Sequence, residues 1–125
     1  MVLDTCALLW LTEGSSQLSK NARRRLSAAP LVYVSAISAF EIGLKYRSGK
    51  LSLPLPPAEW FGAVVEHHAL TVHALDWEIC LAATSLPALH KDPCDRFIIA
   101  TARQLGMPVV TSDPNFAPYG IEVVS

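Results

Sequence analysis

The stretch from His90 to Asp113 constrains the fold more than any other part of the chain, because it contains both ends of a helix. Asp92 and Pro93 form a helix start, since aspartate caps a first turn well and proline is favoured at the first helical position. Gly106 is a typical residue just past a helix end, and the apolar residues in between recur at helical spacing. The pattern therefore predicts a helix from Pro93 to the residue before Gly106.

A short apolar segment, Val109–Thr111, follows this helix and predicts a buried strand. The Asp113-Pro114 pair then turns the chain away from that strand. One continuous segment thus puts Asp95 in the first turn of a helix and Asp113 just past the end of a strand.

Strands and helices alternate along the rest of the chain, a pattern that favours a parallel sheet with helices on both sides. A proline-rich connector, Leu51–Pro57, lies between two of the helices. The other predicted strands are Met1–Leu3, Leu31–Val34, Leu70–His73 and Ile121–Val124, and the other predicted helices are Thr5–Thr12, Ser19–Ala28, Ile37–Arg47, Ala58–His68 and a helix capped by Asp76 that runs to about Ser85. We expect one α/β domain over residues 1–125, with a mostly parallel sheet of four to five strands.

Composition agrees with this fold and indicates the cellular compartment. The 125 residues are 51% hydrophobic and 17% charged, as expected for a sheet that is covered on both faces. Three cysteines without a Cys-x-x-Cys pair predict a reducing compartment, and the N-terminal residues lack the basic region of a secretion signal and the length of a membrane span. We therefore expect a cytoplasmic protein without a membrane partner.

Four acidic residues occupy positions that a parallel sheet brings to one edge. Asp4 and Asp113 each follow a predicted strand, and Glu41 and Asp95 lie in the first turns of helices that usually start on the same side. Each also has an ordinary explanation, because Asp4 can simply cap its helix and Asp113 is a common turn residue. Asp92 is best explained as the cap of its helix alone.

Glu41 is the most informative of the four, because it lies on an apolar helix face where a lone charge is unfavourable. A capping box with Ser38, or an ion pair with Lys45 one turn later, would explain it without a functional site. Its face of the predicted helix also carries Ile37, Phe40 and Leu44.

Clustered carboxylates repel one another unless a cation joins them. Oxygen ligands alone favour Mg²⁺ or Mn²⁺, and the absence of His or Cys spacing argues against zinc. Such a centre typically binds a phosphate group, activates water and stabilises the leaving oxygen. If the four acidic residues bind a metal, the remaining seven acidic and ten basic residues leave a mild positive excess that permits a nucleic-acid partner.

The ordered set of motifs resembles a PIN domain, specifically the VapC-type toxin of a VapBC toxin–antitoxin pair. The resemblance spans nearly the whole chain, and no single motif carries it. Its residues are Leu3-Asp4-Thr5 with Ala7–Trp10, Ser38–Ile42 with Lys45 and Gly49–Leu51, Leu86-Pro87, His90, Asp92–Arg96, Ala100, and Thr111–Asp113.

This resemblance implies a three-layer α/β/α fold, metal-dependent endoribonuclease activity, a cognate antitoxin and a homodimer. By position, the family's acidic quartet corresponds to Asp4, Glu41, Asp95 and Asp113. Thr5 and Thr111 correspond to supporting hydroxyl residues. The chain departs from the family where Phe40 replaces a frequent Trp and Cys6 a frequent His.

Several other residues have a structural explanation and a functional one. The four histidines, His67, His68, His73 and His90, lack metal-binding spacing, and we expect them to be structural or surface residues. Only His90 is close to the site in sequence, where a local contact is expected and the positioning of a phosphate is the alternative. The run Arg23–Arg25 is expected to be a solvated helix face, whereas Arg96 could pair with a carboxylate or meet substrate. Core packing is the expected role of Trp10, Leu11, Trp60 and Phe61, with an antitoxin groove as the alternative.

Three other functions are compatible with part of the sequence. A haloacid-dehalogenase-like phosphatase would need a second Asp where Cys6 stands. A receiver-like signalling domain would need an Asp at the end of its third strand, where the chain has His73. A PIN-type module without catalysis, acting only as a binding partner, is the third.

Overall fold

The computed structural model describes all of residues 1–125 and contains a five-stranded sheet in the order β3-β2-β1-β4-β5. Every neighbouring pair of strands is parallel. Val2 lies opposite Tyr33 on one side and Val109 on the other, which sets the central register. The strands are β1 (Val2–Leu3), β2 (Tyr33–Ser35), β3 (Thr71–His73), β4 (Val109–Val110) and β5 (Val123–Val124).

Six α-helices connect these strands, and most begin at a residue whose side chain caps the first turn. Asp4, Ser19, Ser35, Asp76 and Asp92 each accept a hydrogen bond from a backbone amide two or three residues further on, as good capping residues do. The helices are α1 (Thr5–Glu13), α2 (Lys20–Ala28), α3 (Ala36–Arg47), α4 (Pro57–His67), α5 (Trp77–Ser85) and α6 (Pro93–Leu105), with a short 3₁₀ helix, η1 (Ala117–Tyr119).

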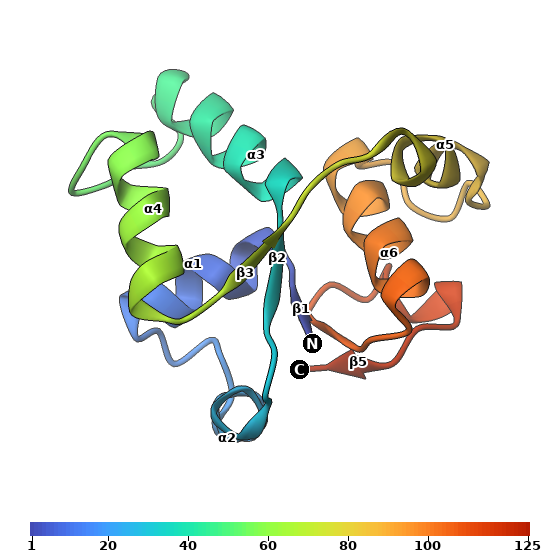
Figure 1. The fold of residues 1–125 in the computed structure, drawn as a ribbon, viewed down its shortest axis with the longest axis horizontal. Helices are drawn as coiled ribbons and strands as arrows, with labels where there is room; N and C mark the ends of the chain where they lie inside the picture. Colours follow the sequence, from blue (N-terminus) through green and yellow to red (C-terminus); the bar gives the residue numbers. More distant parts are fainter.

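The helices form a layer on each face of the sheet (Figure 1). One face packs against α1, α2 and α4 through a core that includes Leu3, Leu8 and Trp60. The other packs against α6 through Ile98 and Ile99, and α5 packs mainly against α6. This arrangement confirms the three-layer α/β/α fold.

Nearly all predicted elements are present, with ends shifted by a few residues. Gly106 ends α6 with a φ of 63°, a backbone conformation that glycine adopts without strain. The sequence did not reveal η1. The alternative explanation of Glu41, a capping box with Ser38, is excluded. The helix α3 begins earlier, at Ala36, and its cap is Ser35.

The strand order reverses between β1 and β4, since the chain moves outward in one direction through β2 and β3 and in the other through β5. Side chains that follow β1 and β4 at their carboxyl ends therefore meet at this reversal point, where α/β sheets bind ligands. None of the helices is both long and apolar enough to cross a lipid bilayer.

Candidate active site

Asp4 follows β1 directly and is nearly inaccessible to solvent, with 5% of its surface exposed. Its Oδ1 accepts a hydrogen bond of 2.7 Å from the amide of Ala7, so Asp4 does cap α1. Burial raises the pKa of Asp4, and hydrogen bonds from Thr111 and Ala7 oppose that rise. The charges of Asp113 and Glu41 raise the pKa of Asp4 further, which shows that the capping residue also belongs to an acidic cluster.

Glu41 points from α3 toward the same place. Its Oε2 lies 3.1 Å from Nζ of Lys45, so the predicted ion pair within the helix is present. Burial lowers the pKa of Lys45, but the hydrogen bond and charge of Glu41 outweigh that effect and the net pKa is raised. The other oxygen, Oε1, is buried and has no hydrogen-bond partner. The Lys45 pair therefore satisfies only half of this carboxylate.

The prediction that Glu41 lies on a buried apolar face of its helix is only partly correct. Ile37 is buried, but Phe40 and Leu44 are 58% and 52% exposed. These two side chains face solvent because α3 packs against α1, α4 and α6 and leaves one flank uncovered.

Asp95 lies in the first turn of α6, close to the capping residue Asp92. Oδ1 of Asp92 accepts a 2.9 Å hydrogen bond from the amide of Cys94, which confirms its structural role. Burial and then the charge of Asp92 raise the pKa of Asp95 to about 7, although contact with His90 opposes the rise. Asp95 therefore lies in a strongly negative and partly desolvated environment.

Asp113 is the fourth carboxylate of the group and lies in the segment after β4. Its amide donates to the hydroxyl of Thr111, and its Oδ1 accepts hydrogen bonds from the amide and side chain of Asn115. Thr111 is buried, and its hydroxyl, which accepts from the amide of Asp113, also lowers the pKa of Asp4.

All four carboxylates line one cavity of about 310 Å³, together with Thr5, Cys6, Lys45 and Asp92. The hydroxyl of Thr5 lies 2.9 Å from the hydroxyl of Ser38, and both are buried. This contact ties the start of α1 to α3. Ser38 belongs to the quoted motifs, but its contact with Thr5 joins positions 33 residues apart and no local pattern predicts it.

His90 lies beside the carboxylates and makes the local contact that its closeness in sequence to Asp95 favours. Its Nε2 lies 2.8 Å from Oδ2 of Asp95 and 3.3 Å from Oδ2 of Asp113. One ligand atom from each of these three residues lies within 4.8 Å of the others. Two features of the sequence point to His90, its closeness to Asp95 and its place among the motifs of the resemblance.

Arg96 neither pairs with a carboxylate nor faces the cavity. Its guanidinium donates hydrogen bonds to four backbone carbonyl groups, one in the last turns of α5 and three in the segment between α5 and α6: those of Ala83, Leu86, Pro87 and His90. Tyr119 joins the same network, donating to the carbonyl of Pro87 and accepting from the amide of His90. Arg96 and Tyr119 therefore hold the His90 segment in place.

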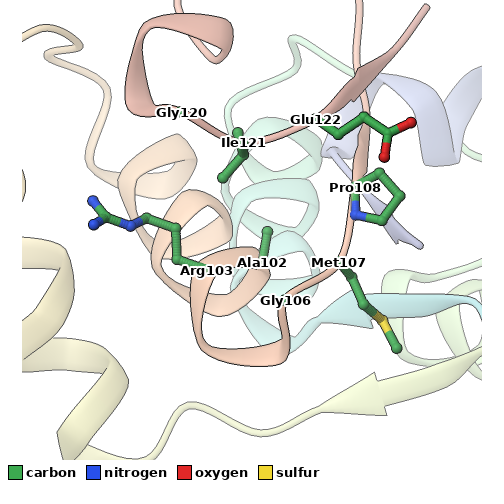
Figure 2. A pocket seen from close by; sticks show the side chains of 8 residues that line it. All are labelled: Ala102, Arg103, Gly106, Met107, Pro108, Gly120, Ile121 and Glu122. Carbon is green, nitrogen blue, oxygen red and sulfur yellow. The ribbon is translucent and has the colours of Figure 1, made fainter.

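A second hollow, of about 360 Å³, lies at the opposite edge of the sheet, where β4 and β5 begin (Figure 2). Its charged side chains, Arg103 and Glu122, point away from each other (Figure 2), and Glu122 is its one acidic lining residue. Arg25 pairs with Glu122 near this edge, and Arg23 binds two backbone carbonyl groups. Arg24 is exposed, as expected for a solvated helix face, whereas Arg23 and Arg25 are half-buried and make structural contacts.

The donor set at the carboxyl edge fits a divalent cation. A buried carboxylate oxygen without a partner is unfavourable, and Oε1 of Glu41 is such an atom. After burial, the charge of Glu41 is the largest cause that raises the pKa of Cys94, to about 11, so the negative field also reaches this neighbouring thiol. A cation among the carboxylates would relieve both the repulsion and the missing partner.

A family model supplies the deciding comparison: the model of the PIN domain matches residues 1–121. The chain belongs to the PIN-domain family. This membership confirms the resemblance and argues against the phosphatase and receiver-like alternatives. His73 indeed ends β3, where a receiver-like domain would need an acidic residue.

Individual relatives agree with the family. The chain is 29% identical over 114 residues to Ribonuclease VapC22 of Mycobacterium tuberculosis, which covers 90% of this chain and 86% of the relative. Its fold is similar to DNA-bound VapBC from Salmonella typhimurium (TM-score 0.70, 21% identity, 98% of this chain and 95% of that chain). It is also similar to VapBC2 from Rickettsia felis bound to a promoter fragment (TM-score 0.71, 13% identity, 98% and 96%).

Proposed function

We propose that residues 1–125 form a single nuclease domain, the toxin of a toxin–antitoxin pair, which hydrolyses RNA phosphodiester bonds with a bound Mg²⁺ or Mn²⁺ ion. The observation that carries this proposal is the convergence of Asp4, Glu41, Asp95 and Asp113 on one cavity, with one buried oxygen left without a partner. The similarity to a VapC ribonuclease supports RNA as the substrate.

The four carboxylates would hold the ion, and their neighbours would keep them in place. A divalent cation supplies Lewis-acid stabilisation of a phosphate and lowers the pKa of water. Thr111 holds the amide of Asp113, the Thr5–Ser38 contact fixes the start of α1, and Lys45 binds one oxygen of Glu41 and leaves the other available to the ion.

The proposed assembly contains a cognate antitoxin and a second copy of the chain. Several large apolar side chains are more than half exposed, on α3 and on α5, and provide surface for such partners: Phe40, Leu44, Trp77 and Leu81. The similar solved structures are toxin–antitoxin complexes, which supports an antitoxin partner. Free thiols at all three cysteines are consistent with a cytoplasmic setting.

The test is cleavage of a structured RNA by the purified protein, with Mn²⁺ or Mg²⁺ and with a chelator. We expect Asp4→Asn and Asp95→Asn each to lower the cleavage rate by at least about 100-fold, because each removes a ligand charge. Asp76→Asn is the matched control, since Asp76 caps α5 as Asp4 caps α1 but lies outside the cavity.

Asparagine caps helices about as well as aspartate, so all three variants should fold. Wild-type cleavage by Asp4→Asn or Asp95→Asn would reject the proposal. A wild-type protein that binds neither ion would favour a PIN-type module without catalysis.

A further inference from the structure

His90 is held at the site by contacts to both its backbone and its ring. Its amide donates a 2.8 Å hydrogen bond to the hydroxyl of Tyr119, and its carbonyl accepts one of 3.2 Å from Arg96. The imidazole contacts the ring of Phe116 edge-on, with centroids 5.9 Å apart, and Phe116 is completely buried. With these contacts in place, the ring stays beside the carboxylates.

The position of Nε2 suits a metal ligand. It lies 2.8 Å from one carboxylate oxygen, of Asp95, and 3.3 Å from another, of Asp113. Two neighbouring ligands of an octahedral ion, each about 2.1 Å from it, are about 3 Å apart. The imidazole and both carboxylates are also largely shielded, with side-chain exposures of 11%, 16% and 29%.

We propose that Nε2 of His90 binds the divalent cation directly, beside Asp95 and Asp113, and that this nitrogen makes the site prefer Mn²⁺ over Mg²⁺. The proposal rests on the metal dependence argued above and adds a ligand to it. The 2.8 Å contact between Nε2 of His90 and Oδ2 of Asp95 holds one proton, and the cation replaces that proton, which leaves to solvent. A neutral imidazole with its proton on Nδ1 then presents a lone pair at Nε2. It adds a donor atom without adding negative charge to a cluster that already contains four carboxylates.

The expected selectivity follows from ligand chemistry. Mg²⁺ prefers oxygen ligands and retains several waters, whereas transition-metal ions accept imidazole nitrogen readily. A site of oxygens alone would discriminate weakly between Mg²⁺ and Mn²⁺. A site with one imidazole held in position should bind Mn²⁺ more tightly than Mg²⁺, and that difference should depend on His90.

The first experiment compares the affinities of the full chain for Mn²⁺ and Mg²⁺. Mn²⁺ is titrated and its free form measured by electron paramagnetic resonance, and Mg²⁺ is then added as competitor. His90→Phe retains a ring against Phe116 but has no ligand atom, and His67→Phe is the control at an exposed histidine. We expect His90→Phe to weaken Mn²⁺ binding about 10-fold or more and Mg²⁺ binding about 2-fold or less, and the control to change neither.

The second experiment needs no variant. Pulsed electron paramagnetic resonance of Mn²⁺ bound to protein with ¹⁵N-labelled histidine should show the hyperfine coupling of a directly bound nitrogen. His90 is the histidine within reach of the carboxylates. Bound Mn²⁺ without that coupling overturns the proposal, even if His90→Phe fails to fold.

The remaining outcomes separate this inference from the proposed function. If Asp4→Asn abolishes Mn²⁺ binding while His90→Phe binds both ions as the wild type does, the metal site stands and the role of His90 is rejected. If the wild type binds neither ion, both proposals are rejected.

Discussion

At the carboxyl edge of the sheet, carboxylates from four segments share one cavity, whereas at the amino edge Glu122 pairs with Arg25 in solvent. The first group has raised pKa values at Asp4 and Asp95 and a buried oxygen without a partner. The second is an ion pair of 3.2 Å with side-chain exposures of 40% and 61%. A cluster of carboxylates that repel one another, with one oxygen lacking a hydrogen-bond partner, points to a bound ligand. An ion pair exposed to solvent does not.

The largest expected difference between the two edges is the response to a divalent cation. Mn²⁺ at 100 times its Kd should raise the free energy of unfolding of the wild type by about 2.7 kcal/mol, because it binds the folded state. Thermal unfolding with and without Mn²⁺ measures this. The stabilisation should be lost in Asp4→Asn and retained in Asp76→Asn, and equal stabilisation of both variants would contradict a site at the carboxyl edge.

The next effect is the pH dependence of stability when a chelator removes divalent ions. The folded-state pKa of Asp95, about 7, lies above its ordinary value of 3.8, so the folded chain binds this proton more tightly than the unfolded chain. Stability should therefore fall as the pH rises from about 4 to about 7. The loss should be about 2 kcal/mol after allowing for solvent screening of a partly exposed group.

Urea unfolding between pH 4.5 and pH 8 checks this prediction, with Asp95→Asn as the variant that should flatten the curve. Saturating Mn²⁺ should reverse the trend, because the cation competes with protons for the carboxylates. A wild-type curve that rises over this range in chelator would contradict the raised pKa of Asp95.

The fold could be predicted largely from local signals. The Asp92-Pro93 start, the Gly106 end and the alternation of apolar strands with capped helices are properties of neighbouring residues, and they place nearly every element. The convergence of the carboxylates required one further rule, that parallel strands end at the same edge. That rule brought Asp4 and Asp113 together correctly because β1 and β4 are neighbours.

The surroundings of the carboxylates could not be predicted in this way. His90 reaches the site because Tyr119, 29 residues further on, holds its amide, and because Arg96 binds four carbonyl groups of α5 and of the segment between α5 and α6. Such contacts depend on tertiary packing rather than on spacing. The exposure of Phe40 was mispredicted for a similar reason, since helical spacing does not tell which flank of α3 stays uncovered.

The smallest expected effect lies at the amino edge and is Glu122→Gln. This change removes an exposed ion pair with Arg25, so it should lower the free energy of unfolding by less than about 1 kcal/mol. High salt should abolish even that difference, because it screens charges in solvent. Urea unfolding at low and high salt measures both effects.

The variant should also retain the full stabilisation by Mn²⁺, since Glu122 lies at the opposite end of the strands from the carboxylate cavity. A larger loss of stability, or a weaker response to Mn²⁺, would mean that the two edges are coupled through the short strands β4 and β5.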